Sequence, residues 1–233
     1  MNLSPIAYIT SPYKQKFAIP RQPNLVKEAK GEIVFEKDFS DPNCLRDIEQ
    51  FSHLWLIFVF HETQDKGWSP TVQPPRLGGK ENVGVFATRS TFRPNPLGMS
   101  VVENLGWEQL GSSLILKIGG LDLLDGTPIL DIKPYLPYAD ALPDAKAGFA
   151  ESIPGSQYEI VFSAEAEHEL NKLQQDYPEL KAFISSVLQQ DPRPAWRKKE
   201  IDEKRYGMNL YDLNIKWQIQ GNQIHVISIN PES

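Results

Sequence analysis

The chain has 233 residues, of which 40% are hydrophobic and 23% charged, and its formal net charge is −6. These values are typical of a globular protein with one large domain, or with a domain and a smaller companion. They exclude a broadly basic nucleic-acid-binding protein, because affinity for phosphates requires positive charge. If nucleic acid is the partner, the positive charge must be local. The single cysteine, Cys44, excludes a disulfide framework and a multi-thiolate metal site.

The hydropathy pattern indicates a protein outside the membrane. The longest clean apolar run, residues 54–60, is far shorter than the roughly 18 residues that a membrane helix needs. The first residues contain no charged region and no signal-peptide core. We therefore expect a cytoplasmic protein.

The first two-thirds of the chain are typical of a β protein. Short strand candidates are separated by turns rich in proline and glycine, which favours a barrel or a sandwich over repeated βαβ units. The segment 45–51 predicts one or two helical turns. The predicted strands are residues 5–10, 31–36, 54–60, 83–88, 99–105, 114–118 and 129–135.

The last third has a different pattern, which follows a linker at residues 148–157. Ser163 is suited to cap a helix that runs to Tyr177, and Pro178 fits the first turn of a second helix that ends before residue 191. Alternating residues 213–219 and 224–229 predict a hairpin around Gly221-Asn222. We expect a β domain at residues 1–150 and a small α+β domain at residues 151–233.

Several familiar motifs are absent. No G-x-G-x-x-G follows a strand, so a Rossmann-type cofactor loop is not supported, and no G-x-S-x-G elbow is present. Residues 78–81 resemble the end of a P-loop but lack its first glycine and its hydroxyl residue. The four histidines show no H-x-x-x-H spacing, and we expect no metal site.

The densest polar segment is residues 87–100. Two prolines flank Asn95 and restrict the backbone around it, so that Arg89, Arg93 and Asn95 are expected to project in fixed directions. Such preorganisation suits a binding site. The alternative is a proline-rich connection with solvated arginines.

A second polar segment follows at residues 121–135. Asp125 and Gly126 form a turn signal, and alternation in the next strand places Asp131, Lys133 and Tyr135 on one face. These three residues predict a charged wall of a site. The alternative is an ion pair on a solvated surface, which contributes little energy.

Three further features have two interpretations each. Residues 20–23 form a stiff polar loop, and His61-Glu62 ends the most apolar strand, where a histidine is more often a rim residue than a base. The basic segment 193–205 contains Trp196, so it is suited to bind RNA phosphate and stack on a base. It is equally compatible with a solvated loop.

At these segments the sequence resembles the tRNA (N6-threonylcarbamoyladenosine) methyltransferase family. The resemblance covers most of residues 1–150 and continues more loosely through DPRPAWRKKE (191–200). The matching motifs are long and unusual in composition: PRQP (20–23), FSHLWLIFVFHE (51–62), FATRSTFRPNPLGMS (86–100) and LDLLDGTPILDIKPYLPYAD (121–140).

The resemblance implies a single-sheeted β-barrel methyltransferase domain, S-adenosylmethionine as donor, and a homodimer with the donor site near the subunit contact. The implied acceptor is N6 of the threonylcarbamoyl-modified adenosine just 3′ of the anticodon in a threonine tRNA. By match to the family motifs, the donor contacts are Pro20, Arg21, Gln22, His61, Glu62, Arg89, Met99, Leu121, Asp122, Leu123 and Leu124.

Given that reaction, roles for the remaining polar residues are hypotheses. Asp125 or Asp131 is expected to hydrogen-bond the exocyclic amine, with Lys133 and Tyr135 beside it. Arg93 is suited to pair with the threonyl carboxylate of the modified base, and Asn95 is suited to hydrogen-bond an adenine edge.

Arg197 and Lys198 are expected to bind RNA, and the C-terminal domain is expected to supply RNA grip. Two rival functions remain: methylation of a small molecule or protein, and a non-catalytic module that binds S-adenosylmethionine or tRNA.

Overall fold

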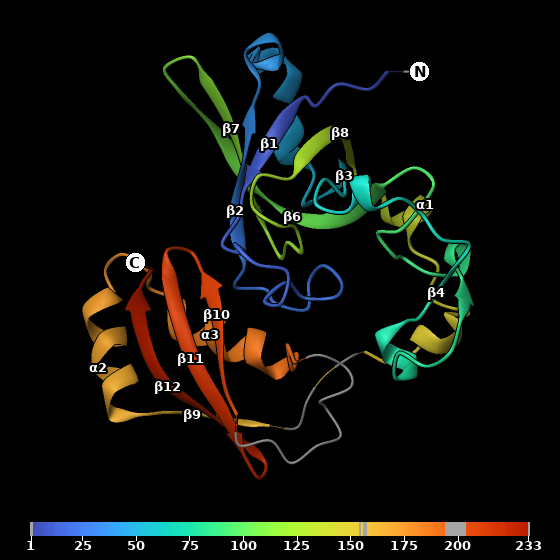
Figure 1. Ribbon diagram of the computed structural model, residues 1–233. Coiled ribbons are helices and arrows are strands. Elements are labelled where there is room, and N and C mark those ends of the chain that lie inside the picture. Colours follow the sequence, from blue (N-terminus) through green and yellow to red (C-terminus); the bar gives the residue numbers. More distant parts are fainter. Residues whose placement is uncertain (1, 154, 156–157, 194–203, 233) are drawn as a thin grey trace.

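Figure 1 shows the computed structural model, which describes residues 2–153, 155, 158–193 and 204–232. Strands predominate over helices, which confirms the mainly β class. The first part of the chain forms one group of strands, and the C-terminal part forms a separate sheet with helices against it.

Six strands of the first part form a closed barrel in the order β1-β2-β7-β6-β3-β8. All neighbours are antiparallel, and β8 pairs with both β3 and β1, so the order returns to its start. The barrel strands are β1 (Ala7–Thr10), β2 (Lys30–Phe35), β3 (His53–Val59), β6 (Leu97–Leu110), β7 (Ser113–Gly119) and β8 (Pro128–Pro134).

The alternation of side chains along β3 explains how the barrel is filled. Leu54, Leu56 and Phe58 are buried in its interior, while Trp55 and Ile57 lie half-buried on the outer face. The sequence predicted a buried strand because every residue is apolar, yet one face of this strand is not covered by the rest of the chain. This apolar outer face continues onto exposed Met99 of β6, which pairs with Ile57.

Strand β6 bends and pairs with two different strands. Its first half pairs with β3 and its second half with β7, and the register shifts between Asn104 and Trp107. The Asn104 side chain donates to the carbonyls of Ile48 and Phe51 at 2.9 and 2.8 Å, and it accepts the amide of Gly106 at 3.1 Å. Gly106 has φ +92°, a conformation that favours glycine, so this residue permits the bulge at the barrel's corner.

The excursion between β3 and β6 contains only a two-stranded sheet, β4 (Thr71–Val72) with β5 (Val83–Gly84). The predicted strand at residues 83–88 is therefore wrong beyond Gly84, because a 3-10 helix follows at Val85–Ala87. The amide and hydroxyl of Thr88 both donate to the Val85 carbonyl, at 3.1 and 2.8 Å, and this tight turn replaces ladder hydrogen bonds. The helical turns predicted at residues 45–51 are confirmed as 3-10 turns at Pro42–Leu45 and Ile48–Gln50.

The C-terminal sheet has the order β10-β11-β12-β9, in which only β9 and β12 are parallel. Helices α2 and α3 pack against one face of this sheet, on which β11 buries alternate apolar side chains. The elements are α1 (Pro137–Asp140), β9 (Glu159–Phe162), α2 (Ala164–Leu173), α3 (Leu180–Gln189), β10 (Arg205–Leu210), β11 (Leu213–Gln220) and β12 (Gln223–Pro231).

Two local predictions for this part are confirmed and one needs correction. Ser163 caps α2, its hydroxyl accepting the amide of Ala166 at 3.1 Å, and Gly221 has φ +60° in the turn between β11 and β12. Helix α2 ends at Leu173 rather than Tyr177, because Pro178 disfavours helical geometry in the residue before it. Helix α3 accordingly begins at Leu180, two residues after the proline. No helix in the described part of the chain has the length and apolarity to cross a membrane.

The two parts share one continuous hydrophobic cluster. Tyr13, which follows β1, is fully buried against Phe183 of α3, with ring centroids 5.8 Å apart. Lys30 of β2 also pairs with Glu179 at the start of α3. The C-terminal part is therefore packed onto the barrel rather than suspended from a linker.

A glycine-specific contact in β6 gives a testable prediction. A Cβ at Gly98 would lie 2.4 Å from two ring carbons of Phe58 and 2.8 Å from the ring of Phe60. We expect Gly98→Ala to lower the free energy of unfolding by about 1–3 kcal/mol, because the two packed rings must shift. Thermal and urea unfolding would measure this loss. Gly84→Ala, where no atom lies within 4 Å of the added Cβ, is the matched control, and equal loss in both variants would contradict the explanation.

Candidate active site

The loop at residues 11–29 contacts each of the segments that were expected to bind the donor. Gln22 accepts a hydrogen bond from Nη1 of Arg89 at 2.5 Å, and Lys16 lies 3.5 Å from the Glu62 carboxylate. Asn24 donates its amide to the Gly120 carbonyl at 2.8 Å, immediately before the 121–124 segment. The structure therefore brings residues 20–22, 61–62, 89 and 121–124 together around one loop.

Asp122 is the most perturbed carboxylate of this group. Its Oδ1 accepts a hydrogen bond from the Ser100 hydroxyl at 2.6 Å. Burial raises the pKa of Asp122 to about 6, against the opposing effects of the Ser100 hydrogen bond and the nearby Arg89 charge. A carboxyl group with such a pKa beside an arginine is typical of a functional site.

The other predicted donor residues differ in accessibility. Pro20, Leu121 and Leu123 are buried and shape the loop, whereas Arg21 is exposed. Met99 is 55% exposed on the outer face of β6 and alternates with Ser100, which points to the interior. The side chain of Met99 thus lies on the opposite side of the barrel wall from Ser100, which bonds Asp122.

The predicted catalytic residues of β8 do share one face, as alternation required, and this face is the outside of the barrel. Asp131 and Lys133 form an ion pair at 2.9 Å with side chains 46% and 61% exposed. The Tyr135 ring lies 6.0 Å from that of Trp55. Asp131 pairs across the strands with Ile57, which in turn pairs with Met99, so these three residues lie side by side on the outer face.

Asp125 occupies a different position and is already engaged. Its Oδ1 accepts the amide of Ser11 at 2.8 Å, and its Oδ2 lies 2.7 Å from Nζ of Lys14. These bonds fasten the turn after residues 121–124 to the end of β1. Asp125 therefore has a structural role in this turn.

The two residues expected to recognise the acceptor lie in the connection that precedes β6. Nη1 of Arg93 donates to the carbonyls of Thr88 and Val85, at 2.8 and 3.4 Å, so this arginine holds its own loop. Asn95 is exposed. Trp196, Arg197 and Lys198 lie outside the described residues.

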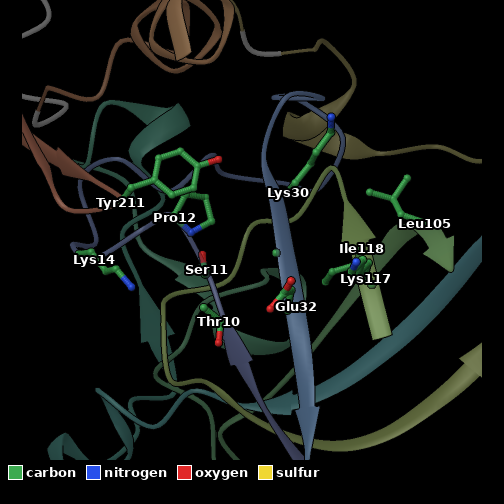
Figure 2. A pocket seen from close by; sticks show the side chains of 11 residues that line it. Thr10, Ser11, Pro12, Lys14, Lys30, Glu32, Leu105, Lys117, Ile118 and Tyr211 are labelled. Carbon is green, nitrogen blue, oxygen red and sulfur yellow. The ribbon is translucent and has the colours of Figure 1, made fainter. Parts of the chain in front are cut away.

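A pocket of about 430 Å³ lies elsewhere, between the barrel and the β10–β11 turn (Figure 2). Three lysines line it, and each is paired with a carboxylate: Lys14 with Asp125, Lys30 with Glu179 and Lys117 with Glu108. Arg89, Gln22 and Asp122 do not line this pocket. The arrangement of hydrogen bonds, rather than the pocket, therefore identifies the candidate site.

Comparison with known proteins agrees with this geometry. A family model for the tRNA-methyltransferase O N-terminal domain matches residues 8–141, and one for the TrmO C-terminal domain matches residues 155–232. The chain belongs to the tRNA-methyltransferase O family. The matched N-terminal range contains nearly all of the barrel and the contacts of the 11–29 loop with Glu62, Arg89 and Gly120.

Relatives of the chain extend over its whole length. A tRNA (adenine(37)-N6)-methyltransferase from Escherichia coli K12 is 52% identical, with 97% of this chain and 96% of the relative covered. A putative S-adenosylmethionine-dependent methyltransferase, RcsF, from Pseudomonas aeruginosa is 45% identical over 93% and 91% of the two chains. The crystal structure of TrmO from Pseudomonas aeruginosa matches with a TM-score of 0.80 and 38% identity, covering 99% and 98%.

Sequence reasoning missed the residues that organise this tRNA-methyltransferase O site. Ser100 orients Asp122, and Ser11 fixes the neighbouring turn; Ser100 ends the polar segment 87–100 but was assigned no role, and Ser11 lies outside the polar segments. A signal was present for Ser100, since it is a polar residue at an inward position of a strand whose inward neighbours are apolar. Asn24 offered none, because its contacts depend on how the loop folds.

The raised pKa of Asp122 predicts a pH dependence of stability. Between about pH 4 and about pH 6 the folded protein holds a proton on Asp122 that the unfolded chain has lost, so the free energy of unfolding falls as pH rises through this range. Asp122→Asn should remove this contribution, which urea unfolding at several pH values would measure.

Ser100→Ala tests the cause of that shift. It removes the hydrogen bond that lowers the Asp122 pKa, so the fall in stability should extend to higher pH than in the wild type. A slope in Asp122→Asn identical to that of the wild-type protein would contradict the assignment.

Proposed function

We propose that this protein transfers a methyl group from S-adenosylmethionine to N6 of adenine 37 of a tRNA. The proposal is supported by the full-length similarity to a tRNA (adenine(37)-N6)-methyltransferase. The observation that carries it structurally is the convergence of Arg89, Gln22 and the Ser100-bound Asp122 around one loop.

The chemistry of this group suits the donor. S-adenosylmethionine supplies a methyl group on a positively charged sulfonium, and it also carries an ammonium and a carboxylate. An ionised Asp122 attracts the sulfonium and the ammonium of the donor. The Arg89 guanidinium is suited to form two parallel hydrogen bonds with the donor carboxylate. Gln22 holds Arg89 through its side-chain oxygen, which fixes the direction of the guanidinium. We propose Pro20, Arg21, His61, Glu62, Met99 and residues 121–124 as the remaining donor contacts.

For the acceptor, we propose the threonylcarbamoyl-modified adenosine of a threonine tRNA. Nη1 of Arg93 is occupied by loop carbonyls, but the described residues supply no acceptor for its Nη2, which suits the threonyl carboxylate. Asn95 is exposed and suits an adenine edge. The target base must leave its stack to reach these groups, which costs least in a loop.

The transfer also needs a proton acceptor. As N6 attacks the methyl group, the carbon–sulfur bond breaks, the sulfonium becomes a neutral thioether, and N6 loses a proton. We assign this proton to Asp131 rather than Asp125, because the Asp131 side chain is 46% exposed on the outer face, whereas Asp125 is 34% exposed and fastens its turn to Ser11 and Lys14. Oδ1 of Asp131 accepts the amide of Ile132 at 2.9 Å, its Oδ2 pairs with Lys133 at 2.9 Å, and Tyr135 completes the wall.

The division of labour that we propose follows the two parts of the chain. Residues 1–150 form the methyltransferase domain, and residues 151–233 form a smaller domain that grips the tRNA with the help of Arg197 and Lys198. A cytoplasmic location agrees with a tRNA substrate. Local basic residues are required in this arrangement because the chain as a whole carries a net charge of −6.

We further propose a homodimer that buries the outer face of β3, β6 and β8. Trp55, Ile57, Leu97 and Met99 present apolar side chains there, and Leu97 and Met99 are 38% and 55% exposed. A contiguous apolar patch of this kind is unfavourable in water and is typical of an interface. The dimer would place Met99 and the Asp131–Lys133 pair next to the subunit contact.

The dimer is tested by a charge on this face. Leu97→Asp should convert the dimer to a monomer, because a buried unpaired carboxylate costs several kcal/mol. The mass in solution is measured by sedimentation equilibrium. The matched control is Leu110→Asp at the far end of the same strand, where Leu110 is 58% exposed. This variant should leave the mass unchanged. A wild-type protein that sediments as a monomer would contradict the proposal.

The reaction is tested with labelled S-adenosylmethionine and two threonine tRNA samples, one carrying the threonylcarbamoyl group and one lacking it. We expect label only in the modified tRNA. Asp131→Asn should lower kcat by about 10²–10⁴-fold while leaving donor affinity unchanged, because general-base catalysis contributes that much.

Two comparisons make this test specific. Asp38→Asn, an exposed acid in a 3-10 turn distant from the site, should retain full activity. Label entering both tRNA samples would still show methyltransferase activity, but it would contradict the proposed recognition of the threonyl carboxylate by Arg93. Donor binding without any transfer would favour a non-catalytic binding module.

A further inference from the structure

The segment at residues 11–13 is bonded to the proposed donor-binding segment on one side. The Ser11 hydroxyl donates to the Leu123 carbonyl at 2.7 Å, and the Ser11 amide donates to Asp125 at 2.8 Å. The Asp125 amide donates back to the Tyr13 carbonyl at 3.0 Å. These three bonds hold the residues that directly follow Asp122, so the position of Asp122 depends on where the 11–13 segment lies.

On its other side, the same segment is bonded to the C-terminal part. The Tyr211 amide donates to the Pro12 carbonyl at 2.8 Å, and Tyr13 forms an isolated β-bridge with Leu210. The Tyr13 ring packs against Phe183 with centroids 5.8 Å apart. Figure 2 shows Tyr211 beside Pro12 and Ser11 at the rim of the pocket. The 11–13 segment is therefore held between the donor-binding segment and the C-terminal part.

Two unfavourable features are retained at this contact. Tyr13 is 0% exposed, and its hydroxyl has no hydrogen-bond partner among the described residues. Burial, and then the charge of Asp122, raise its pKa above the ordinary value. Tyr211 has φ +55°, which is rare for a residue with a large side chain, and its ring packs on Tyr177 and Phe183. The contact of Tyr13 with Phe183 and the bond from the Tyr211 amide to Pro12 join the two parts at this point.

We propose that Tyr13 is a positioning residue for donor binding, through which the C-terminal part holds the 121–125 segment in its binding conformation. This inference rests on the proposed function, in which residues 121–124 contact S-adenosylmethionine. Its consequence is that Phe183, a residue of α3 with no part in the donor contacts, contributes to donor affinity. The C-terminal part then assists the barrel as well as gripping tRNA.

The test compares three variants of the full-length protein by calorimetric titration with S-adenosylmethionine, at a temperature where circular dichroism shows each to be folded. Phe183→Ala and Tyr13→Ala should raise the Kd for the donor about tenfold, a typical coupling between sites. Tyr13→Phe keeps the ring contact and loses only the unpartnered hydroxyl, so it should restore the Kd to within about twofold of wild type.

Steady-state kinetics provide a readout that loss of stability would not change. The KM for the donor should rise in Phe183→Ala while kcat remains near the wild-type value, because no group at the reacting atoms has been altered. Tyr211→Gly is a second variant in case Phe183→Ala does not fold, since glycine readily adopts φ +55° and the backbone bond to Pro12 can remain. It should raise the donor KM in the same direction.

Leu170→Ala is the matched control, because Leu170 of α2 is 8% exposed in the same hydrophobic cluster but its side chain forms no hydrogen bond or ring contact with the 11–13 segment. It should lower the melting temperature and leave the donor Kd unchanged. An unchanged Kd in Phe183→Ala and Tyr211→Gly, or an equal rise in Leu170→Ala, would overturn the positioning role. A wild-type protein that binds no donor would instead contradict the proposed function, and this inference with it.

Discussion

The hydrogen bonds of Ser11 are the interaction on which the candidate site depends. Ser11 is 3% exposed, so the Leu123 carbonyl and the Ser11 amide have no water to replace these bonds. Loss of such a bond leaves a buried polar group unsatisfied, which costs about 1–3 kcal/mol. The bonds fix where β1 ends and where the 11–29 loop begins. The approach of Gln22 to Arg89 and of Asn24 to Gly120 follows from that starting point.

The carboxylates of the proposed site lie on both faces of the barrel wall. Asp122 is half-buried beside Ser100, and Asp131 lies on the outer face in an ion pair with Lys133. The lysines of the pocket between the two parts are each neutralised by a carboxylate, so that pocket offers little attraction to phosphate. An acidic protein with this pattern has to attract a polyanion through a few arginines and lysines elsewhere, and its affinity for tRNA should depend steeply on which of them are present.

Much of the fold followed from the sequence because it depends on local rules. Short apolar runs between turns rich in proline and glycine identified the barrel strands, and the Ser163 cap and the Gly221 turn were predicted from single residues. Strands β9 and β10 were missed, because β9 is only four residues long and β10 begins next to a charged segment. The motif at residues 86–100 was misread as beginning with a strand, since Val85 and Phe86 are apolar while the turn is fixed by Thr88.

The site was less predictable than the fold. Resemblance to a family located the segments, and alternation correctly placed Asp131, Lys133 and Tyr135 on one face. Neither could show that this face is the outside of the barrel, nor that Arg93 holds its own loop, because both depend on how distant segments pack. The partners of Asp125 were equally unpredictable, since Ser11 and Lys14 are more than a hundred residues away in the sequence.

The bend in β6 has a consequence for how the chain tolerates insertions and deletions. One strand supplies ladder partners to β3 before Asn104 and to β7 after it, and the bulge between them absorbs the difference in register. Deleting Gly106 would invert the facing of every residue from Trp107 to the end of the strand, because the side-chain period is two. The β6–β7 turn at Gly111 has open space around it and can accept extra residues. Natural variation in length should therefore accumulate at that turn and be absent from the bulge a few residues away.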